Sequence, residues 1–312
     1  VASKLYQNKP KNLIAVTGTN GKSSIADFYF QILNLNKKKV ASIGTLGVKT
    51  NKAKSNIDNT TLDPISLNRY LQKIKKINID NVILEASSHG LKQNRLDGLD
   101  FKTGVFTNLS HDHLDYHKSF KNYLDSKLIL FKNLLKKNSN VVTDTDIPQY
   151  SIIKNISKKK NHKIFTIGYK KSNLKLLKHN YRDEKQLFQI KYKNKIYDID
   201  VNLIGKIQIK NILMAMILAE KSNLKFNKIV KSINKIKHVS GRFEKIGSLK
   251  NNSKVILDYA HTPDALEKCL INLKEQFFDK KISIVFGCGG DRDKFKRSQM
   301  GKIANKYCDN IY

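Results

Sequence analysis

The stretch AVTGTNGKSSIADF, residues 15–28, has the order of parts of a phosphate-binding loop. An apolar run ends at Val16, two small polar residues stand between Gly18 and Gly21, and Lys22 leads into a helical pattern. The most familiar phosphate loop has four residues between its glycines instead of two. The stretch therefore predicts either a shorter relative of that loop or an ordinary strand–turn–helix with an incidental lysine.

The composition indicates a soluble globular protein. A chain of 312 residues with 40% hydrophobic content can bury a core and is long enough for two domains. No apolar run approaches the roughly 20 residues that cross a bilayer, and residues 1–12 lack the apolar stretch of a signal peptide. Three cysteines without C-x-x-C spacing argue against a disulfide framework or a zinc knuckle. We therefore expect a cytoplasmic protein, a monomer, with no membrane partner.

The net charge of +33 suggests a nucleic-acid partner as one alternative. Only 6 of the 59 basic residues are Arg, the better ligand for phosphates and base edges. The lysines flank apolar segments along the whole chain instead of forming one block. An AT-rich genome, whose codons favour Lys, Asn and Ile, accounts for this charge equally well, so a nucleic-acid-binding protein is the minor alternative.

The first 143 residues alternate short apolar runs with helical periodicity. Buried strands are expected over residues 12–18, 38–45, 80–87, 101–109 and 139–144, and helices over 24–35 and 65–77. This alternation predicts an α/β fold with a mostly parallel sheet and helices on its faces.

The later part of the chain changes pattern twice. Period-two alternation over residues 163–169, 187–193 and 195–205 predicts a small antiparallel addition, and helices are expected over 208–224 and 225–237. The α/β alternation then resumes, with strands over 255–261 and 281–290, a helix over 263–275 and a last helix. We place a boundary near residue 239, between a P-loop ATPase domain (1–239) and an incomplete Rossmann-like domain (240–312). Two strands are too few to close such a sheet, so a fragment of a longer protein is expected.

The loop residues suit a nucleotide. A helix N-terminus offers free N–H groups and a positive dipole end to an anion, and Gly18 and Gly21 allow close backbone approach. Lys22 can neutralise the β- and γ-phosphate oxygens of ATP, and the Ser23 hydroxyl can bind Mg²⁺.

Glu85 ends the apolar run NVILE at the edge of the predicted sheet where ligands lie. A carboxylate there can hold Mg²⁺ directly or through water. The alternative is a helix-capping acid beside Ser87 and Ser88.

The stretch LSHDHLDYH, residues 109–117, concentrates side chains that bind metals. It contains His111, Asp112, His113, Asp115 and His117. The pattern H-x-H-x-D-H is a dinuclear zinc signature of metallo-hydrolases, but Tyr116 shifts the spacing by one residue. A zinc hydrolase is therefore a rival enzyme class, and a solvated polar loop is the plain alternative.

Eight motifs in chain order resemble those of the Mur ligases, in their UDP-N-acetylmuramoyl-tripeptide synthetase (MurE-type) branch. They are TGTNGKSS, NTTLDP, EASSHGLKQNRLDG, TNLSHDHLDYH, YLDSKLILF, GRFE, DYAHTPDALE and FGCGGDRDKFKR. The resemblance spans about residues 5–309, and the two-residue spacing between the loop glycines is the family's own version of the loop.

This resemblance implies an ATP- and Mg²⁺-dependent amide ligase of peptidoglycan precursor synthesis. Such an enzyme phosphorylates the free carboxylate of D-Glu in UDP-MurNAc-L-Ala-D-Glu, and the amine of a diamino acid then attacks the acyl phosphate. The last motif resembles the branch that adds meso-diaminopimelate. A folylpolyglutamate synthetase-like ligase, which shares the core, is the nearest alternative.

The resemblance also implies roles for individual residues. The ATP-binding set is Gly18, Thr19, Asn20, Gly21, Lys22, Ser23, Ser24, Asn211, Arg242, Asp258 and His261. The substrate-binding set is Asn59, Thr60, Thr61, Ser87, Gln93 and Arg95 for the muramyl dipeptide, with Arg292 for the diamino acid. The metal ligands are Ser23, Glu85, His113 and Lys127, and the catalytic set is Lys22, Glu85, His113 and Lys127. The lysine that matches Lys127 is carbamylated in the family, which turns a cation into an anionic ligand for Mg²⁺.

Overall fold

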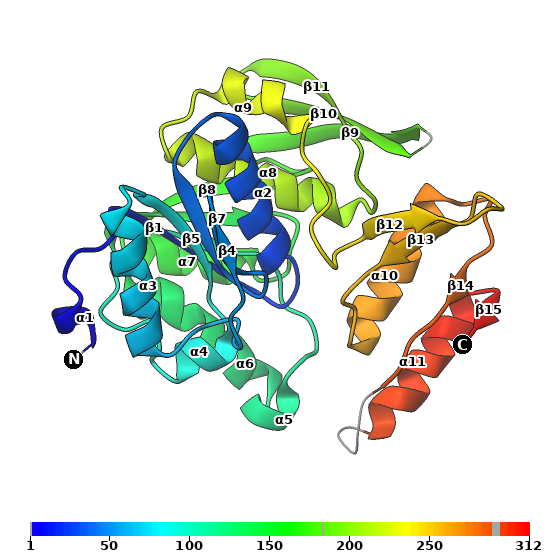
Figure 1. Cartoon of the computed structure of the whole chain (residues 1–312), viewed down its shortest axis with the longest axis horizontal. Helices are drawn as coiled ribbons and strands as arrows, with labels where there is room; N and C mark the ends of the chain where they lie inside the picture. Colours follow the sequence, from blue (N-terminus) through cyan, green and yellow to red (C-terminus); the bar gives the residue numbers. More distant parts are fainter. Residues whose placement is uncertain (1, 183, 289–293) are drawn as a thin grey trace.

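The computed structural model describes residues 2–182, 184–288 and 294–312, and its main element is an 11-stranded sheet (Figure 1). The strand order is β11-β10-β9-β8-β7-β6-β1-β5-β2-β3-β4. The strands are β1 (Asn12–Thr17), β2 (Val40–Gly44), β3 (Gly47–Thr50), β4 (Lys54–Ser55), β5 (Asn81–Glu85), β6 (Phe101–Phe106), β7 (Leu135–Asp144), β8 (Lys163–Gly168), β9 (Leu174–Arg182), β10 (Lys185–Tyr192) and β11 (Lys195–Val201). Strands β2, β5, β1, β6, β7, β8 and β9 pair in parallel in turn, and β9–β10–β11 are antiparallel. The predicted mostly parallel sheet with an antiparallel addition is confirmed.

Four strands depart from the prediction. Strand β8, which we assigned to the antiparallel addition, pairs in parallel with β7 and with β9. Strand β9 was not predicted, and neither was the antiparallel edge formed by β3 and β4. The reason is physical: period two reports which side chains are buried, and it does not report the direction of the neighbouring strand.

Helices cover both faces of the sheet. On one face lie α2 (Lys22–Leu35), α8 (Ile207–Lys221) and α9 (Phe226–Ile233); on the other lie α3 (Pro64–Lys76), α4 (Ser88–Lys92), α6 (Phe120–Ile129) with its π-helical continuation η1 (Leu130–Leu134), and α7 (Tyr150–Lys159). Strand β1 contributes to the cores on both faces of the sheet. Ile14 and Val16 belong to the core under α2 and α8, and Leu13 and Ala15 belong to the core under α3 and α6. Two short helices, α1 (Ala2–Leu5) and α5 (Leu114–His117), lie outside these layers. No helix in the described ranges is long and apolar enough to cross a bilayer.

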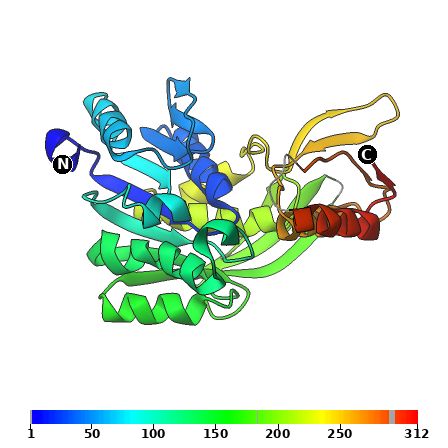
Figure 2. The same cartoon turned by 90° about the horizontal axis from the view of Figure 1, so that it is seen from below.

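Residues 240 onward lie to one side of the sheet in both views (Figures 1 and 2). Their elements are β12 (Glu244–Ser248), β13 (Lys254–Leu257), α10 (Pro263–Gln276), β14 (Ser283–Ile284), α11 (Lys294–Tyr307) and β15 (Asn310–Ile311). The strand expected over 281–290 is only two residues long, with residues 289 and 290 outside the described ranges. Helix α10 joins this part to the rest, because the Gln276 side chain accepts a hydrogen bond of 2.9 Å from the Gly205 N–H.

Replacing Ile212 by Ala should lower the free energy of unfolding by about 2–5 kcal/mol, because the side chain is fully buried between α8 and the sheet and leaves a cavity. Urea denaturation of the full-length protein measures this. The matched control is Ile65→Ala, whose side chain is 54% exposed, with an expected change within about 0.5 kcal/mol. Equal losses in the two variants would contradict the assigned core.

Candidate active site

The glycines of the loop between β1 and α2 are required by its geometry. Gly18 and Gly21 have φ angles of 145° and 90°, which L side chains rarely adopt. A Cβ atom at Gly18 would overlap Thr107 Oγ1, and one at Gly21 would lie 2.7 Å from Asn211 Oδ1. The loop backbone therefore packs directly against two other segments, and its close approach to an anion stays a prediction.

The end of β6 holds the loop in place. The Asn108 carbonyl accepts from the Thr19 N–H at 3.0 Å, and Asn108 Oδ1 accepts from the Asn20 N–H at 3.0 Å. The Thr107 hydroxyl and the Asn108 amide both donate to the Asn20 carbonyl, at 2.6 and 3.1 Å. We did not predict Thr107 or Asn108 as site residues, although both stand in a motif that carried the resemblance. Their signal was their place at the carboxyl end of a strand adjacent to β1.

Two lysines converge on one carbonyl oxygen of the loop. The ammonium of Lys22 donates to the Gly18 carbonyl at 2.9 Å and to the Thr19 carbonyl at 2.8 Å. Lys127, from α6, donates to the same Gly18 oxygen at 2.8 Å, and its side chain is 1% exposed. Among the residues that the structure describes, no carboxylate forms an ion pair with either lysine. The site therefore brings two positive groups together without a carboxylate in ion-pair contact, although the charges of Glu85 and Asp112 act on Lys22 from farther away.

Burial lowers the pKa of both lysines. For Lys127 the pKa lies well below its ordinary value, because desolvation and then the charge of Lys22 oppose protonation. Desolvation also lowers the pKa of Lys22, partly offset by Glu85 and Asp112. A lowered pKa raises the share of neutral amine at a given pH, and a neutral amine is a nucleophile.

Glu85, at the end of β5, lies beside the first turn of α2. Its carboxylate accepts from the Ser23 hydroxyl at 3.0 Å, from the Thr45 N–H at 2.8 Å and from the Thr45 hydroxyl at 3.2 Å. Its neighbour Gly44 leaves no room for a Cβ atom. Glu85 is 2% exposed and caps no helix; Ser87 has that role for α4. The predicted pair of Ser23 and Glu85 is thus in direct contact, and Thr45 is a residue that the prediction missed.

The histidine-rich stretch does not form a zinc centre. In residues 2–182, 184–288 and 294–312 there is no group of three or more His, Cys, Asp or Glu side chains able to hold a metal. His113 has a left-handed backbone with φ 51°, and its Nε2 lies 3.3 Å from Asp112 Oδ2. The His117 ring is fully buried, and its two nitrogens contact the hydroxyl groups of Ser88 and Ser126. The rival prediction of a dinuclear zinc hydrolase therefore has no support in the described residues.

Most residues predicted for the dipeptide gather beside Glu85. Thr61 donates to the Glu85 carbonyl at 2.9 Å and accepts from the Ser87 N–H at 2.9 Å, and Arg95 donates to the Thr61 carbonyl at 2.7 Å. The Thr60 hydroxyl lies 3.0 Å from that of Thr45, which connects this group to the Glu85 carboxylate.

Two further residues of that set lie at its rim. The Gln93 amide donates to the Tyr116 hydroxyl at 3.3 Å, and Asn59 is exposed. Their side chains are therefore exposed, whereas the group around Thr61 is held by hydrogen bonds.

The predicted nucleotide contacts lie on two elements. Asn211, on α8, lies against Gly21 and donates to the Gln208 side chain at 2.9 Å, so Gln208 orients its amide. Beyond β13, Asp258 accepts from the Phe243 and Ala260 N–H groups, and burial raises its pKa.

Two other residues predicted to contact the nucleotide lie beside Tyr259. The Arg242 guanidinium lies 4.5 Å from the centre of the Tyr259 ring, and its charge is close enough to Lys22 to lower that lysine's pKa. The His261 ring donates from Nδ1 to the Tyr259 carbonyl at 3.0 Å. Arg292 lies outside the described residues.

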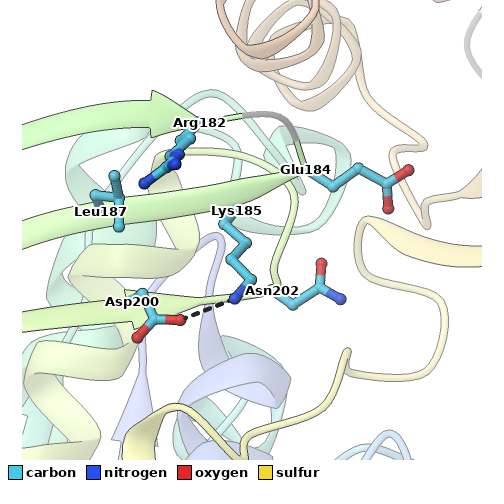
Figure 3. A pocket seen from close by; sticks show the side chains of 6 residues that line it. All are labelled: Arg182, Glu184, Lys185, Leu187, Asp200 and Asn202. Carbon is cyan, nitrogen blue, oxygen red and sulfur yellow. Dashed lines mark hydrogen bonds and ion pairs between the residues drawn. The ribbon is translucent and has the colours of Figure 1, made fainter.

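A separate hollow of about 550 Å³ lies on the antiparallel strands (Figure 3). It is lined by Arg182, Glu184, Lys185, Leu187, Asp200 and Asn202. Lys185 and Asp200 pair across it at 3.3 Å, and it contains no predicted site residue. The loop region, not this hollow, is the candidate active site.

Two known sequence families match parts of the chain. The pattern of the Mur ligase middle domain matches residues 16–219, which include the loop, Glu85, Lys127 and Asn211. This chain belongs to the Mur ligase family. The Mur ligase glutamate ligase domain matches residues 241–312.

Two relatives and one solved structure that are similar to this chain share one name. UDP-N-acetylmuramoyl-L-alanyl-D-glutamate–2,6-diaminopimelate ligase of Rickettsia montanensis is 41% identical over 311 residues, covering 98% of this chain and 64% of the relative. The protein of that name from Rickettsia bellii is 42% identical over 315 residues, covering 98% and 65%. A solved structure of a ligase of the same name has 30% identity and a TM-score of 0.79, covering 99% of this chain and 63% of that one. This Mur ligase chain thus spans less than two thirds of the length of these relatives.

The lowered pKa of Lys127 predicts a pH-dependent stability. The unfolded chain binds a proton at Lys127 that the folded chain binds less readily, so stability relative to Lys127→Met should rise as pH increases towards the ordinary lysine pKa of about 10.4. The slope should be at most about 1.4 kcal/mol per pH unit. Urea unfolding of both full-length proteins in CO₂-free buffers measures it. A stability difference that is constant or falls with pH would refute the buried, destabilised ammonium.

Proposed function

We propose that the full-length protein is an ATP-dependent amide ligase that adds meso-diaminopimelate to UDP-MurNAc-L-Ala-D-Glu through an acyl phosphate. The observation that carries this proposal is the convergence of Lys22 and Lys127 on the Gly18 carbonyl, in a glycine-bracketed loop at a helix N-terminus. Family membership and the shared name of the relatives support the choice of reaction. We also propose that residues 1–239 and 240–312 are two domains.

The loop would bind the phosphates of ATP. The Thr19 and Asn20 N–H groups donate to Asn108, so the N–H groups of residues 21–24 and the positive end of α2 would face the anion. The phosphate oxygens would replace the Gly18 and Thr19 carbonyls as partners of the Lys22 ammonium. Asn211 would contact the adenine. Arg242, whose charge already acts on Lys22, would bring a second cation to the phosphates from the other domain, with Asp258 and His261 on the nucleotide-facing edge.

Lys127 would act as a carbamate. Its neutral amine attacks the carbon of CO₂, the new N–C bond forms as one C=O electron pair moves to oxygen, and the amine loses a proton to water. The product carries a negative charge in place of a positive one. Burial beside Lys22 favours this change, because it removes the repulsion between two cations and gives Lys22 an anionic neighbour.

The residues present fit Mg²⁺. The Ser23 hydroxyl and the Glu85 carboxylate already touch, both are buried, and oxygen donors are the ligands that Mg²⁺ prefers. Together with His113 and the Lys127 carbamate they would hold the ion. When bound, Mg²⁺ offsets the repulsion between the phosphate and carboxylate anions.

The dipeptide would bind beside Glu85, through Asn59, Thr60, Thr61, Ser87, Gln93 and Arg95. Its D-Glu carboxylate would then approach the terminal phosphate from the side of β5, while Lys22 stabilises the charge that develops on the transferred group. A carboxylate does not react with amines until one oxygen becomes a good leaving group. Transfer of the phosphoryl group releases ADP, and attack by the amine expels phosphate. Arg292 would face the diamino acid.

Lys22→Ala in the full-length protein should reduce kcat/KM for ligation by at least about 10²–10³-fold, because a buried cation aimed at the transferred phosphoryl group is lost. The assay follows ADP release with ATP, UDP-MurNAc-L-Ala-D-Glu and meso-diaminopimelate. The exposed Lys76→Ala is the matched control and should keep wild-type turnover.

Three outcomes would overturn the proposal. Unchanged turnover in Lys22→Ala would refute the role of the loop lysine. Glutamylation of folate by the wild-type protein, without any use of the muramyl dipeptide, would replace the proposed substrate by that of a folylpolyglutamate synthetase. Binding of polynucleotides that weakens steeply with salt, without Mg²⁺-dependent ATP binding, would favour the nucleic-acid alternative instead.

A further inference from the structure

The His117 ring is buried with a hydroxyl group on each of its nitrogens. Its exposure is 0%, Nε2 lies 3.0 Å from Ser88 Oγ, and Nδ1 lies 3.1 Å from Ser126 Oγ. Burial lowers the pKa of His117 to about 4, so the ring is neutral near pH 7. With both nitrogens occupied, the ring is satisfied within the protein and is not poised to bind a metal.

The hydrogen-bond partners determine which nitrogen carries the proton. Ser126 Oγ lies 2.7 Å from the Asn122 carbonyl, which can only accept, so the Ser126 hydroxyl proton is directed there. Ser126 Oγ must therefore accept from His117, and Nδ1 carries the ring proton. Nε2 is then the acceptor, and the Ser88 hydroxyl donates to it. One neutral tautomer satisfies every group in this chain of hydrogen bonds.

These hydrogen bonds connect the three segments that contain Glu85, His113 and Lys127. Ser88 begins α4, three residues after Glu85, and Ser126 precedes Lys127 in α6. The backbone of His117 adds two more contacts, because its N–H donates to the His113 carbonyl at 3.0 Å and its carbonyl accepts from the Asn122 amide at 3.1 Å.

The ring also supports the surface on which Lys127 lies. The His117 and Tyr123 rings are 5.1 Å apart, and the Lys127 ammonium lies 4.3 Å from the centre of the Tyr123 ring. The Tyr123 hydroxyl in turn lies 3.1 Å from Thr19 Oγ1 in the loop. A displacement of His117 would therefore reach Lys127 by two routes, through Ser126 and through Tyr123.

We propose that His117 is a positioning residue that sets the place of Lys127 relative to Glu85 and the loop, through its hydrogen bonds to Ser126 and Ser88. The inference rests on the proposed function for its link to catalysis. It does not make His117 a metal ligand or a catalytic residue, since both ring nitrogens are engaged by serine hydroxyl groups. Of its two hydrogen bonds, the one to Ser126 acts on the Lys127 helix directly.

Two substitutions separate the two sides of the ring. In His117→Asn the amide can occupy the position of Nδ1 and donate to Ser126, whereas in His117→Gln the amide reaches the position of Nε2 and can accept from Ser88. Both variants are made in the full-length protein, and their thermal unfolding midpoints are compared. We expect His117→Asn to keep kcat within about 3-fold of wild type and His117→Gln to lose about 10²-fold, at similar KM for ATP and dipeptide, because small misplacement of a reacting group is costly.

A second readout does not depend on ligase activity. With ¹³C-bicarbonate, the carbamate of Lys127 should give a carbonyl signal in ¹³C NMR that is absent from Lys127→Met. That signal should persist in His117→Asn and weaken in His117→Gln at the same bicarbonate concentration. Failure of wild-type ligation would count against the proposed function, while the carbamate signals would still test the inference.

The inference is overturned if the two variants have equal kcat and equal carbamate signals, or if His117→Gln retains more of both. If kcat and the carbamate signal fall equally in both variants and in proportion to the unfolding midpoints, His117 is an ordinary core residue and the inference is wrong. The inference is supported if His117→Asn has a higher kcat and a stronger carbamate signal than His117→Gln while the two variants have similar unfolding midpoints.

Discussion

The ammonium groups of Lys22 and Lys127 both donate to the Gly18 carbonyl oxygen, and the other groups of the candidate site lie around this contact. Like charges in a desolvated place repel, and the pKa values of Lys22 and Lys127 are lowered accordingly. The protein tolerates this arrangement because both lysines belong to long, well-packed helices whose cores fix the backbone. Such a site has a strong preference for anions. Phosphate oxygens and a carbamate are the anions that the proposed reaction would bring there.

Topology brings the other groups to the same place. Strands β5, β1 and β6 are parallel neighbours, so their carboxyl ends meet at one edge of the sheet. That edge presents Glu85 on one side of the loop and Asn108 on the other, while α6 returns Lys127 from beyond it. Arg242, in the part of the chain from residue 240 onward, adds a positive charge that acts on Lys22. The site is therefore a consequence of strand order as much as of any single motif.

Sequence reasoning located the elements whose side chains repeat with a clear period, and it failed where contacts between distant segments decide. The loop, the strand that ends in Glu85 and helix α2 follow from local pattern. The parallel pairing of β8 does not follow from local pattern, because a period of two gives no information on strand direction. The contacts of Thr107 and Thr45, and the burial of His117 between two serines, depend on segments far apart in sequence. The burial of Lys127 is of the same kind: a lysine in a helix reads as exposed, and only packing against the loop makes it otherwise.

The most direct test is a crystal structure of the full-length protein with Mg²⁺ and a non-hydrolysable ATP analogue. The account predicts that the terminal phosphates lie in the loop of residues 18–24, with the Lys22 ammonium moved from the Gly18 carbonyl onto a phosphate oxygen. It also predicts metal density between Ser23 and Glu85. A nucleotide bound elsewhere, with Lys22 still on the loop carbonyls, would contradict it.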